Sequence, residues 1–467
     1  MSVYKACDIR GLADGELTPE RYQRWGYKLG LQLPPGAKFV VGGDVRESTP
    51  AFQRALVEGL CQAGLDVVDL KVLPTPMAYY AKRRLGALGC AIVTASHSPP
   101  NINGLKWMIG DRPPGEADVA ALRRAVQPSR SKRAARATSK PRSLDVTFDY
   151  VAWLQERWGA FLGARCRVVL DPMHGCCAVR ARRYLQAVFP QSLFSALHDT
   201  PDPTFAGRAP DCARPENLEE LAEAVYRERA HLGIGFDGDG DRVALVDNEG
   251  NILTAEEATC VLLESFDGQL QDTQFVHDIK FSDRIAEVAR KLGAHPIAER
   301  SGHAFIRTRM LETSAAFGAE VSGHYFFGDL GAGDDGMFTA CRVIGYLWAS
   351  GKSLADLRRA CPAVFITHDL RVPVDPPRQL AVLRQVRKAW SQYPQSLTDG
   401  VRVNFPDGWA LVRNSVTEAA LTFRFESVDW ASLEQLVRRF CRSLGHLGED
   451  LWNRFVQPTG HVEAAPE

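Results

Sequence analysis

The order of apolar and polar residues along the chain predicts strands that end in polar loops. Three segments carry a short apolar run that leads directly to an aspartate. They are AKFVVGGDVREST, CRVVLDPMHGCCAVR and TQFVHDIKFSDRI, and their aspartates are Asp44, Asp171 and Asp278. Runs of this length, rich in β-branched and aromatic residues, predict buried strands, each followed by a loop and the start of a helix.

A second element follows each of these segments. The sequences are ALGCAIVTASHS, HLGIGFDGDGDR and FGAEVSGHYFF, each a short apolar strand running into a polar loop. The pattern therefore repeats weakly, with a period of about 100 residues or slightly more, which predicts three related α/β units. Because sites in α/β proteins are usually built at strand ends, each unit is expected to supply one loop to a common site.

The pattern changes after about residue 365. THDLRVPV and ALTFRFES alternate as strands do, and DWASLEQLVRRFCRSLG is typical of an amphipathic helix with Asp429 as its N-cap. A smaller α+β domain is expected there. We predict domains at 1–143, 144–250, 251–364 and 365–456, followed by a disordered tail at 457–467.

Composition adds limits on partners. The 467 residues are 45% hydrophobic and 24% charged, and 56 basic residues balance 56 acidic ones. This balance favours neither nucleic acid nor a membrane surface as a partner, and the basic stretch 128–143 is interpreted as a linker or a solvated face. The N-terminal sequence resembles no signal peptide and no apolar run approaches membrane-spanning length, so we expect a cytoplasmic protein.

The eleven cysteines are scattered, without a C-x-x-C pair, although Cys176 and Cys177 are adjacent. This arrangement argues against a disulfide framework and against a structural zinc site. We expect most of them to be reduced and buried as small apolar residues.

The sharpest chemical signal is GIGFDGDGDRVALVDNEG. Asp237, Asp239 and Asp241 alternate with glycines after an apolar strand, and such close carboxylates repel one another unless a cation neutralises them. An EF-hand is excluded, because Arg242 stands where that loop needs glycine and Asn248 where it needs glutamate. Hard carboxylate oxygens favour Mg²⁺, which commonly shares its ligands with a phosphate.

Three further loops carry candidate side chains. VTASHSPPNINGLK places Ser96, a candidate nucleophile or phosphate carrier, beside His97 and ten residues before Lys106. In EVSGHYFF, the alternation of Glu320, Ser322 and His324 in an extended segment would direct all three to one side, which suits hydroxyl recognition on a sugar. In the last domain, LVRNSVT combines an arginine with hydroxyls, which is typical of phosphate binding.

Together these segments resemble the α-D-phosphohexomutase family. The resemblance runs along nearly the whole chain, and it rests on these motifs in family order: DIRG, GGDVR, LPTP, TASHSPPNINGLK, FDGDGDR, HDIK, SGHAFIRTRM, EVSGH, GDDG and LVRNSVT. It implies three related α/β domains with mixed sheets, and a C-terminal α+β domain like that of the TATA-binding protein, around a central cleft. A monomer is expected.

The resemblance also implies a role for each candidate. Ser96 would carry the phosphate and complete a Mg²⁺ site with Asp237, Asp239 and Asp241. The residues implied in transfer are Arg10 and Arg242 near the phosphate, and Lys106, His303 and His324 as proton-transfer candidates. The residues implied in binding are Lys280, Glu320, Ser322 and His324 for the sugar, and Arg413, Ser415 and Thr417 for the non-reacting phosphate. The expected activity interconverts hexose 1- and 6-phosphates of mannose or glucose, through a hexose 1,6-bisphosphate.

Four positions depart from the family pattern: Cys7, Ser98, Val416 and Arg307. None of them removes the phosphate carrier or a metal ligand, so activity is still expected. Three alternatives stay open. They are a phosphoglucosamine mutase, a phosphosugar-binding relative without turnover, and a haloacid-dehalogenase-type phosphatase that uses Asp237 and Asp239.

Overall fold

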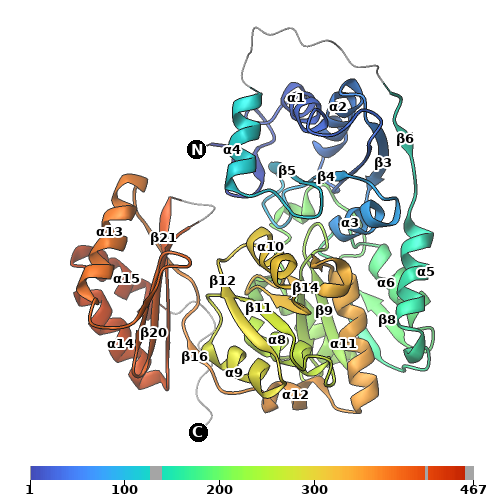
Figure 1. Ribbon diagram of the computed structural model, residues 1–467. Coiled ribbons are helices and arrows are strands. Elements are labelled where there is room, and N and C mark those ends of the chain that lie inside the picture. The colour runs from blue at the N-terminus through green and yellow to red at the C-terminus, as the bar shows by residue number, and fades with distance from the viewer. Residues whose placement is uncertain (1, 127–138, 416–418, 458–467) are drawn as a thin grey trace. The chain divides into compact units, whose positions relative to one another are not determined.

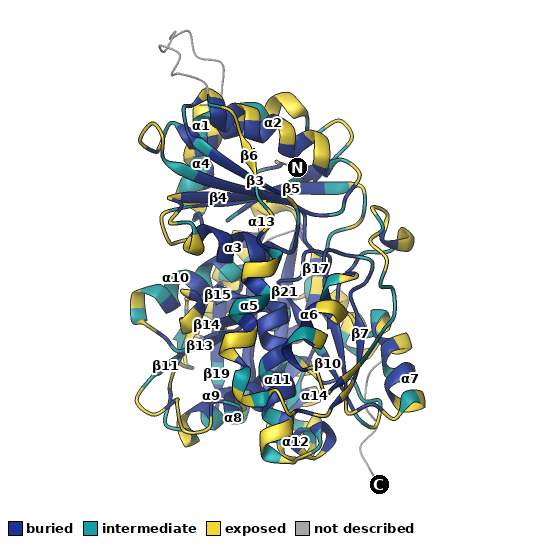
Figure 2. Ribbon diagram, turned by 90° about the vertical axis from the view of Figure 1, so that its right-hand side faces the viewer, coloured by how far each residue is buried: buried dark blue, intermediate teal, exposed yellow. Residues whose placement is uncertain are grey.

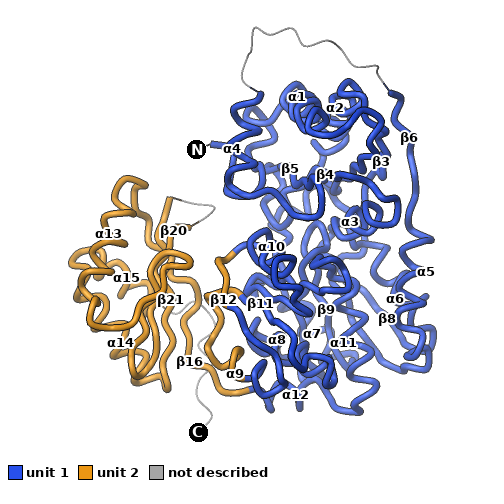
Figure 3. Tube along the Cα trace, in the orientation of Figure 1, with its two compact units in different colours: residues 1–277, 288–297, 302–361 blue, residues 278–287, 298–301, 362–467 orange. Residues whose placement is uncertain are grey.

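The computed structural model describes residues 2–126, 139–415 and 419–457. The chain divides into two compact units, drawn in different colours in Figure 3. Unit 1 comprises residues 1–277, 288–297 and 302–361, and unit 2 comprises residues 278–287, 298–301 and 362–467. Unit 1 therefore holds the first three sheets, apart from the last residues of β11 and β12, and unit 2 holds the fourth.

The first sheet has the strand order β1-β5-β4-β2-β3-β6. Its strands are β1 (Ile9–Leu12), β2 (Lys38–Gly43), β3 (Asp66–Val72), β4 (Gly89–Val93), β5 (Ile102–Ile109) and β6 (Arg142–Ser143). Strand β2 is parallel to β3 and β4, whereas β4 and β5 are antiparallel. The sheet is therefore mixed, and the β4–β5 connection is the loop that carries Ser96.

The second sheet has the order β10-β9-β7-β8 and the third has the order β12-β11-β13-β14-β15. The strands of the second are β7 (Arg167–Asp171), β8 (Leu193–Ala196), β9 (Leu232–Phe236) and β10 (Val243–Asp247). The strands of the third are β11 (Gln274–Asp278), β12 (His295–Glu299), β13 (Phe317–Ala319), β14 (Tyr325–Phe327) and β15 (Gly333–Asp334).

The predicted internal repeat is confirmed by strand order. The runs β5-β4-β2-β3, β10-β9-β7-β8 and β14-β13-β11-β12 follow the same path, and each contains an antiparallel hairpin beside a parallel pair. The three aspartates found by pattern end the equivalent strand, or directly follow it. Each accepts a hydrogen bond from the backbone N–H two residues on, in Arg46, Met173 and Lys280.

Helices cover the sheets, because the central strands are apolar on both faces. Around the first sheet, α1 (Pro19–Gly30) and α2 (Thr49–Gln62) lie on one side and α3 (Thr75–Arg84) on the other (Figure 1). The remaining helices of unit 1 are α4 (Glu116–Ala125), α5 (Thr147–Arg157), α6 (Arg180–Val188), α7 (Glu219–Glu228), α8 (Ala255–Glu264), α10 (His303–Thr313), α11 (Gly336–Ser350) and α12 (Leu354–Ala360). The central strands are almost wholly buried, as the dark ribbons of Figure 2 show.

Unit 2 carries an antiparallel sheet in the order β16-β21-β20-β19-β18, with β17 also pairing with β21. Its strands are β16 (Phe365–Ile366), β17 (Leu370–Pro373), β18 (Gln395–Ser396), β19 (Val401–Phe405), β20 (Gly408–Asn414) and β21 (Ala420–Ser427), and its helices are α13 (Pro376–Ala389), α14 (Trp430–Arg442) and α15 (His446–Val456). Helix α9 (Asp283–Lys291) belongs in part to this unit. The predicted N-cap is confirmed, since Asp429 accepts from Ser432 N–H at 2.7 Å.

The cysteines are free thiols, and all but Cys7 and Cys361 are buried, as expected of small apolar residues. Among the described residues, no helix combines the length and apolar character that crossing a bilayer requires. The predicted tail lies outside the described residues, apart from Gln457.

Candidate active site

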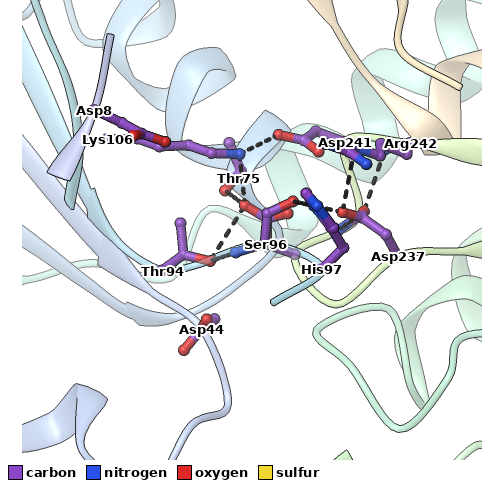
Figure 4. Close-up of polar contacts among 12 residues, drawn as sticks. Asp8, Asp44, Thr75, Thr94, Ser96, His97, Lys106, Asp237, Asp241 and Arg242 are labelled. Carbon is purple, nitrogen blue, oxygen red and sulfur yellow. Dashed lines mark hydrogen bonds and ion pairs between the residues drawn. The ribbon is translucent and has the colours of Figure 1, made fainter. Parts of the chain in front are cut away.

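Ser96 lies in the loop between β4 and β5, and its backbone has a left-handed φ of 52°. Thr94 Oγ1 accepts a hydrogen bond from Ser96 N–H at 2.9 Å and so supports this uncommon conformation. The side chain is fully buried, and its Oγ donates to Asp237 Oδ2 at 2.7 Å (Figure 4). The serine loop and the aspartate loop, whose bonded residues are 141 positions apart in sequence, are therefore joined by a direct bond.

The aspartate loop follows β9 and gathers Asp237, Asp239 and Asp241, all buried, with one oxygen of each within 4.8 Å of the others. Asp239 Oδ1 and Asp241 Oδ1 accept no hydrogen bond from the described residues. Buried carboxylate oxygens without a partner are costly, and a hard divalent cation would satisfy them. The donor set therefore fits a metal ion, as the sequence predicted.

Glycines allow this loop to approach its neighbours at backbone distance. A Cβ on Gly238 would lie 2.7 Å from Ser96 O, and one on Gly240 would lie 2.6 Å from Cys177 Sγ. Gly240 also has a φ of 76°, which a side chain would strain. A main-chain bond from Thr75 N–H to Asp239 O joins the aspartate loop to the first domain, and a bond from Cys176 N–H to Gly238 O holds the loop within the second.

Lys106 on β5 supplies positive charge to the aspartate loop. Its Nζ lies 2.9 Å from Asp239 Oδ2 and 2.5 Å from Asp241 Oδ2. Burial by itself would lower the pKa of Lys106, but the two carboxylates outweigh burial and raise this pKa well above its ordinary value. The ammonium group is therefore held charged, as a proton donor must be.

The carboxylates respond unequally to this environment. Burial and the negative charges of Asp239 and Asp241 raise the pKa of Asp237 well above its usual range. For Asp241, burial acts in the same direction, but the positive charges of Lys106 and His324 prevail and lower the pKa. The cluster is thus only partly neutralised by the protein's own residues, which leaves room for a cation.

His324 is held at both ring nitrogens. Arg242 Nε donates to its Nε2 at 3.0 Å, and its Nδ1 lies 2.8 Å from Asp334 Oδ2. Because Nε2 accepts, the ring proton of the neutral form lies on Nδ1, facing Asp334. Burial would lower the pKa of His324, but the carboxylates of Asp241 and Asp334 raise it overall.

Asp241, His324 and Asp334 form a second group with ligand atoms within 4.8 Å of one another. Arg242 and Asp334 lie opposite the two ring nitrogens of the histidine, so both nitrogens face a charged protein group. The pKa of Asp334 falls to about 2, since the histidine's hydrogen bond and charge outweigh burial. Asp334 therefore orients His324 as a permanently ionised partner.

Two other histidines border the cluster. The ring of His303, at the start of α10, stacks on that of His324 with 5.7 Å between centroids. Burial and the charge of Lys106 lower the pKa of His303 to about 4. His97 Nδ1 lies 3.4 Å from Ser96 Oγ, and burial and the charge of Arg242 hold the pKa of His97 well below its usual range. Both imidazoles are therefore neutral near pH 7 and able to accept a proton.

The EVSGH segment corrects one expectation. It forms a tight turn instead of an extended run, with Gly323 at φ 88° and bonds from Gly323 N–H to Glu320 O and from Glu320 N–H to His324 O. A turn does not direct alternate side chains to one side as a strand would. Glu320 Oε2 and Ser322 Oγ are nevertheless buried, with no hydrogen-bond partner among the described residues.

Two of the residues that depart from the family pattern, Ser98 and Arg307, make specific contacts in the structure. Ser98 Oγ accepts from Arg10 Nη1 at 3.2 Å, while Arg10 Nε pairs with Asp8 at 2.8 Å, so Ser98 helps to orient this arginine. Arg307 is buried, with its guanidinium 4.8 Å from the ring centroid of Tyr79. A planar guanidinium stacks in this way and a lysine does not, so Arg307 is specifically accommodated.

The remaining predicted residues belong to unit 2. Lys280 Nζ lies 3.1 Å from Asp369 Oδ2, and Arg413, near the end of β20, donates from Nε to Asp399 Oδ2 at 2.6 Å. Ser415 follows that strand and its N–H bonds to Ala420 O. The carboxylates hold both cations in ordered positions. Thr417 and Val416 lie outside the described residues.

Three residues without a role predicted from sequence also lie at the site. Thr75 Oγ1 donates to Asp239 Oδ2 at 2.7 Å, Asp334 pairs with His324, and Arg46 bonds to the serine loop. A signal was present, because LPTP, GDDG and GGDVR contain these residues and were among the motifs of the resemblance. Which side chain of each motif reaches the site could be learned only from the fold.

Comparison with known proteins agrees with this geometry. Family models of phosphoglucomutase/phosphomannomutase match as α/β/α domain I at residues 2–130, domain II at 149–250, domain III at 255–365 and the C-terminal domain at 370–443. The phosphomannomutase/phosphoglucomutase of Pseudomonas aeruginosa is 30% identical over 95% of each chain. The phosphomannomutase of Salmonella montevideo is 31% identical over 91% of this chain and 95% of its own.

A solved structure supports the same assignment. The phosphoglucomutase/phosphomannomutase family protein of Burkholderia thailandensis superposes with a TM-score of 0.85 at 27% identity, covering 95% of this chain and 97% of its own. Matches to all four domains in order, and relatives that are similar over nearly the full length, leave no part of the fold unaccounted for. The chain belongs to the phosphoglucomutase/phosphomannomutase family.

Proposed function

We propose that this chain is a phosphohexomutase that interconverts the 1- and 6-phosphates of glucose, mannose or both. The observation that carries the proposal is the bond from Ser96 Oγ to Asp237 at 2.7 Å, made in a buried loop with left-handed backbone. It holds a hydroxyl beside a carboxylate cluster that fits a cation, which is where a phosphate carrier is needed. Membership of the family argues against the dehalogenase-type phosphatase, which leaves Ser96 without a role.

A phosphate on Ser96 would be transferred in two balanced steps. In the first, the phosphorus–oxygen bond to Ser96 Oγ breaks and a bond to a sugar hydroxyl forms, giving a hexose 1,6-bisphosphate. The hydroxyl proton passes to a base, and Ser96 Oγ takes up a proton. After the sugar turns end for end, the same exchange in reverse returns the other phosphate to Ser96.

The cation expected at this site is Mg²⁺, with Asp237, Asp239, Asp241 and the Ser96 phosphate as its ligands. When bound, it would neutralise charge on the transferring phosphoryl group. Arg10 and Arg242 would add further positive charge around that group. Positioning and charge neutralisation of this kind supply most of the catalysis in phosphoryl transfer.

Proton movements follow from the charge states of the site. Lys106 is held protonated and is the group we assign to donate to Ser96 Oγ as the phosphate leaves. His303 is neutral, since its pKa is about 4, and is the group we assign to accept the sugar hydroxyl proton. His324 is fixed by Arg242 and Asp334 and remains a candidate for the opposite sugar orientation.

The sugar would be held by Glu320, Ser322, His324 and Lys280. Glu320 and Ser322 support this because each has a buried oxygen that lacks a partner among the described residues. The phosphate that does not react would bind Arg413, Ser415 and Thr417, as hydroxyls and a guanidinium suit a phosphate. A ligand that binds in two orientations needs such a clamp away from the reacting end.

A coupled assay tests the proposal. The protein is incubated with Mg²⁺ and a trace of hexose 1,6-bisphosphate, and glucose 1-phosphate, mannose 1-phosphate and glucosamine 1-phosphate are compared as substrates. Isomerisation of glucose or mannose phosphate, with phosphate found on Ser96 by mass spectrometry, is the expected result. Preference for glucosamine 1-phosphate would assign the chain to the neighbouring substrate class, and binding without isomerisation of any of the three would overturn the proposal.

A further inference from the structure

Arg46 lies under the serine loop, where the mechanism has so far given it no part. It is 1% exposed, and its guanidinium makes four hydrogen bonds. Nε donates to Asp44 Oδ2 at 2.9 Å, and Nη1 donates to Pro99 O at 2.6 Å. Nη2 donates to Ser96 O at 2.8 Å and to Ser98 O at 2.7 Å.

These bonds go to the backbone of the loop that carries the proposed phosphate. Arg46 donates to the loop carbonyls of Ser96, Ser98 and Pro99, which lie outside the strands, and Pro99 O also accepts from Ile102 N–H. A planar guanidinium can reach three separated carbonyls at once, whereas a lysine ammonium is a single point. Arg46 therefore contacts the loop backbone at Ser96 itself and on its C-terminal side.

The aspartate-loop domain reaches Arg46 from the other side. The ring centroid of Phe205 lies 4.9 Å from the Arg46 guanidinium carbon, and Phe205 is 1% exposed. Phe205 and Ala206 have φ values of 50° and 53°, an uncommon conformation for residues other than glycine. Asp202 holds this turn by accepting from Thr204 N–H at 2.8 Å and Ala206 N–H at 3.0 Å. Strain maintained at a contact in this way is common at functional sites.

We propose that Arg46 is a positioning residue for Ser96, and that Phe205 couples this positioning to the domain that carries the aspartate loop. Ser96 is then fixed at two points. Its Oγ bonds to Asp237, and its carbonyl bonds to Arg46 beneath the stacked ring of Phe205. Without the second point, the loop can turn Oγ away from the aspartates while the fold and the substrate-binding residues remain. The inference rests on the proposed function.

The first test uses Arg46→Lys and Phe205→Leu. For Arg46→Lys we expect kcat to fall about 100-fold, because a small misplacement of a reacting group has this effect. The KM for hexose phosphate should change by less than about threefold, since the substrate-binding residues are untouched. Phe205→Leu should lower kcat about tenfold, and in both variants hydrolysis of the Ser96 phosphate should rise relative to isomerisation.

The matched control is Arg358→Lys. Arg358 also pairs through Nε with a buried aspartate, Asp247, at 2.7 Å, but it lies on α12 and contacts no residue of the serine loop in the bonds described. It should lower the melting temperature without changing kcat or the ratio of hydrolysis to isomerisation. Guanidinium ion should restore at least about tenfold of the activity lost in Arg46→Gly, because it can supply the same hydrogen-bond donors in the vacated space.

Amide hydrogen exchange separates this inference from the proposed function. Residues 94–101 should exchange faster in Arg46→Lys and Phe205→Leu than in the wild-type protein, while residues of α7 exchange as before. This result would support the positioning role even if no hexose phosphate were isomerised. Wild-type exchange at 94–101 in both variants, or wild-type kcat in an active enzyme, would overturn it. If Arg46→Lys fails to fold, Phe205→Leu decides alone.

Discussion

The first and second sheets share one strand order, but their hairpin loops carry side chains of different charge. Each has a strand-end aspartate that caps its own turn, Asp44 in one and Asp171 in the other, and each has a hairpin loop facing the other sheet. In the first sheet, Asp44 pairs with the guanidinium of Arg46, and the hairpin carries a neutral serine. In the second, Asp171 pairs with His198, which titrates, and the hairpin carries three carboxylates.

The repeated fold therefore determines where each loop lies, whereas the individual side chains determine the chemistry of each loop. The hydroxyl and the carboxylates meet because equivalent hairpins converge, and Lys106 crosses from the first sheet to balance the second. Charge is thus distributed between the repeats instead of being balanced within each one. Substitutions that remove one side of this balance test the comparison directly.

The largest effect is expected from Ser96→Ala, which removes the one group that distinguishes the first hairpin. Because a nucleophile cannot be replaced by its neighbours, isomerase activity should fall by at least about 10⁴-fold, with phosphosugar binding retained. Steady-state kinetics and calorimetry measure the two properties. Ser98→Ala is the control in the same loop, and it should lose less than about tenfold, because only one bond to Arg10 is removed. Substantial turnover by Ser96→Ala would exclude Ser96 as the phosphate carrier.

Lys106→Met tests the charge that joins the two sheets. Leaving Asp239 and Asp241 buried without their cation should lower the free energy of unfolding by about 3–5 kcal/mol, as urea denaturation in a chelator would measure. Added Mg²⁺ should restore more stability to this variant than to the wild type. Lys82→Met is the matched control, since Lys82 is also buried but pairs with Asp111, whose side chain is 91% exposed. Equal losses in the two variants would contradict the proposed balance.

His303→Gln extends the comparison to the third sheet. The pKa of His303 in the folded protein is about 4, below its ordinary 6.5, so unfolding takes up a proton between these values and stability falls as the pH drops from 6.5 towards 4. The ring keeps some contact with solvent, so the loss should be on the order of 2 kcal/mol. Denaturation at pH 7 and pH 4.5 should show a smaller difference in His303→Gln than in the wild type.

The smallest effect, of opposite sign, is expected from His198→Gln. The hydrogen bond to Asp171 raises the pKa of His198 above 6.5, so its stabilisation is complete below pH 6.5 and is lost as the pH rises through the raised value. Because the pair is partly exposed, its contribution should not exceed about 1 kcal/mol. Stability curves from pH 6 to pH 9 would show it. A pH response of the same kind at the Asp44–Arg46 turn, which contains no histidine, would contradict the comparison.

Much of the fold could be predicted from sequence, because strands that are buried on both faces consist of continuous runs of apolar residues. The three strand–aspartate segments and the Asp429 N-cap were found in this way and are confirmed. The domain boundaries at 143, 250 and 364 remain predictions. The turn at Glu320–His324 was wrongly read as extended, because alternation over five residues does not distinguish a strand from a turn closed by Gly323.

Some residues of the site could likewise be predicted from sequence and others could not. Asp237, Asp239 and Asp241 could be predicted, since their close spacing in the sequence implies repulsion that a cation would relieve. Thr75 and Asp334 could not, because each depends on a partner brought from a different element by folding. Nor does sequence reveal that the pKa of His303 is lowered, as burial beside Lys106 is a property of the assembled structure.

The main-chain contact between the serine and aspartate loops has a practical consequence. Thr75 N–H bonds to Asp239 O and Gly238 packs against Ser96 O, so the first two repeats are joined by backbone contacts as well as by side chains. This contact between the two repeats does not require that they belong to one polypeptide. A gene divided between the codons for residues 126 and 139 should therefore yield two polypeptides that associate when co-expressed, and neither half alone should possess the complete centre.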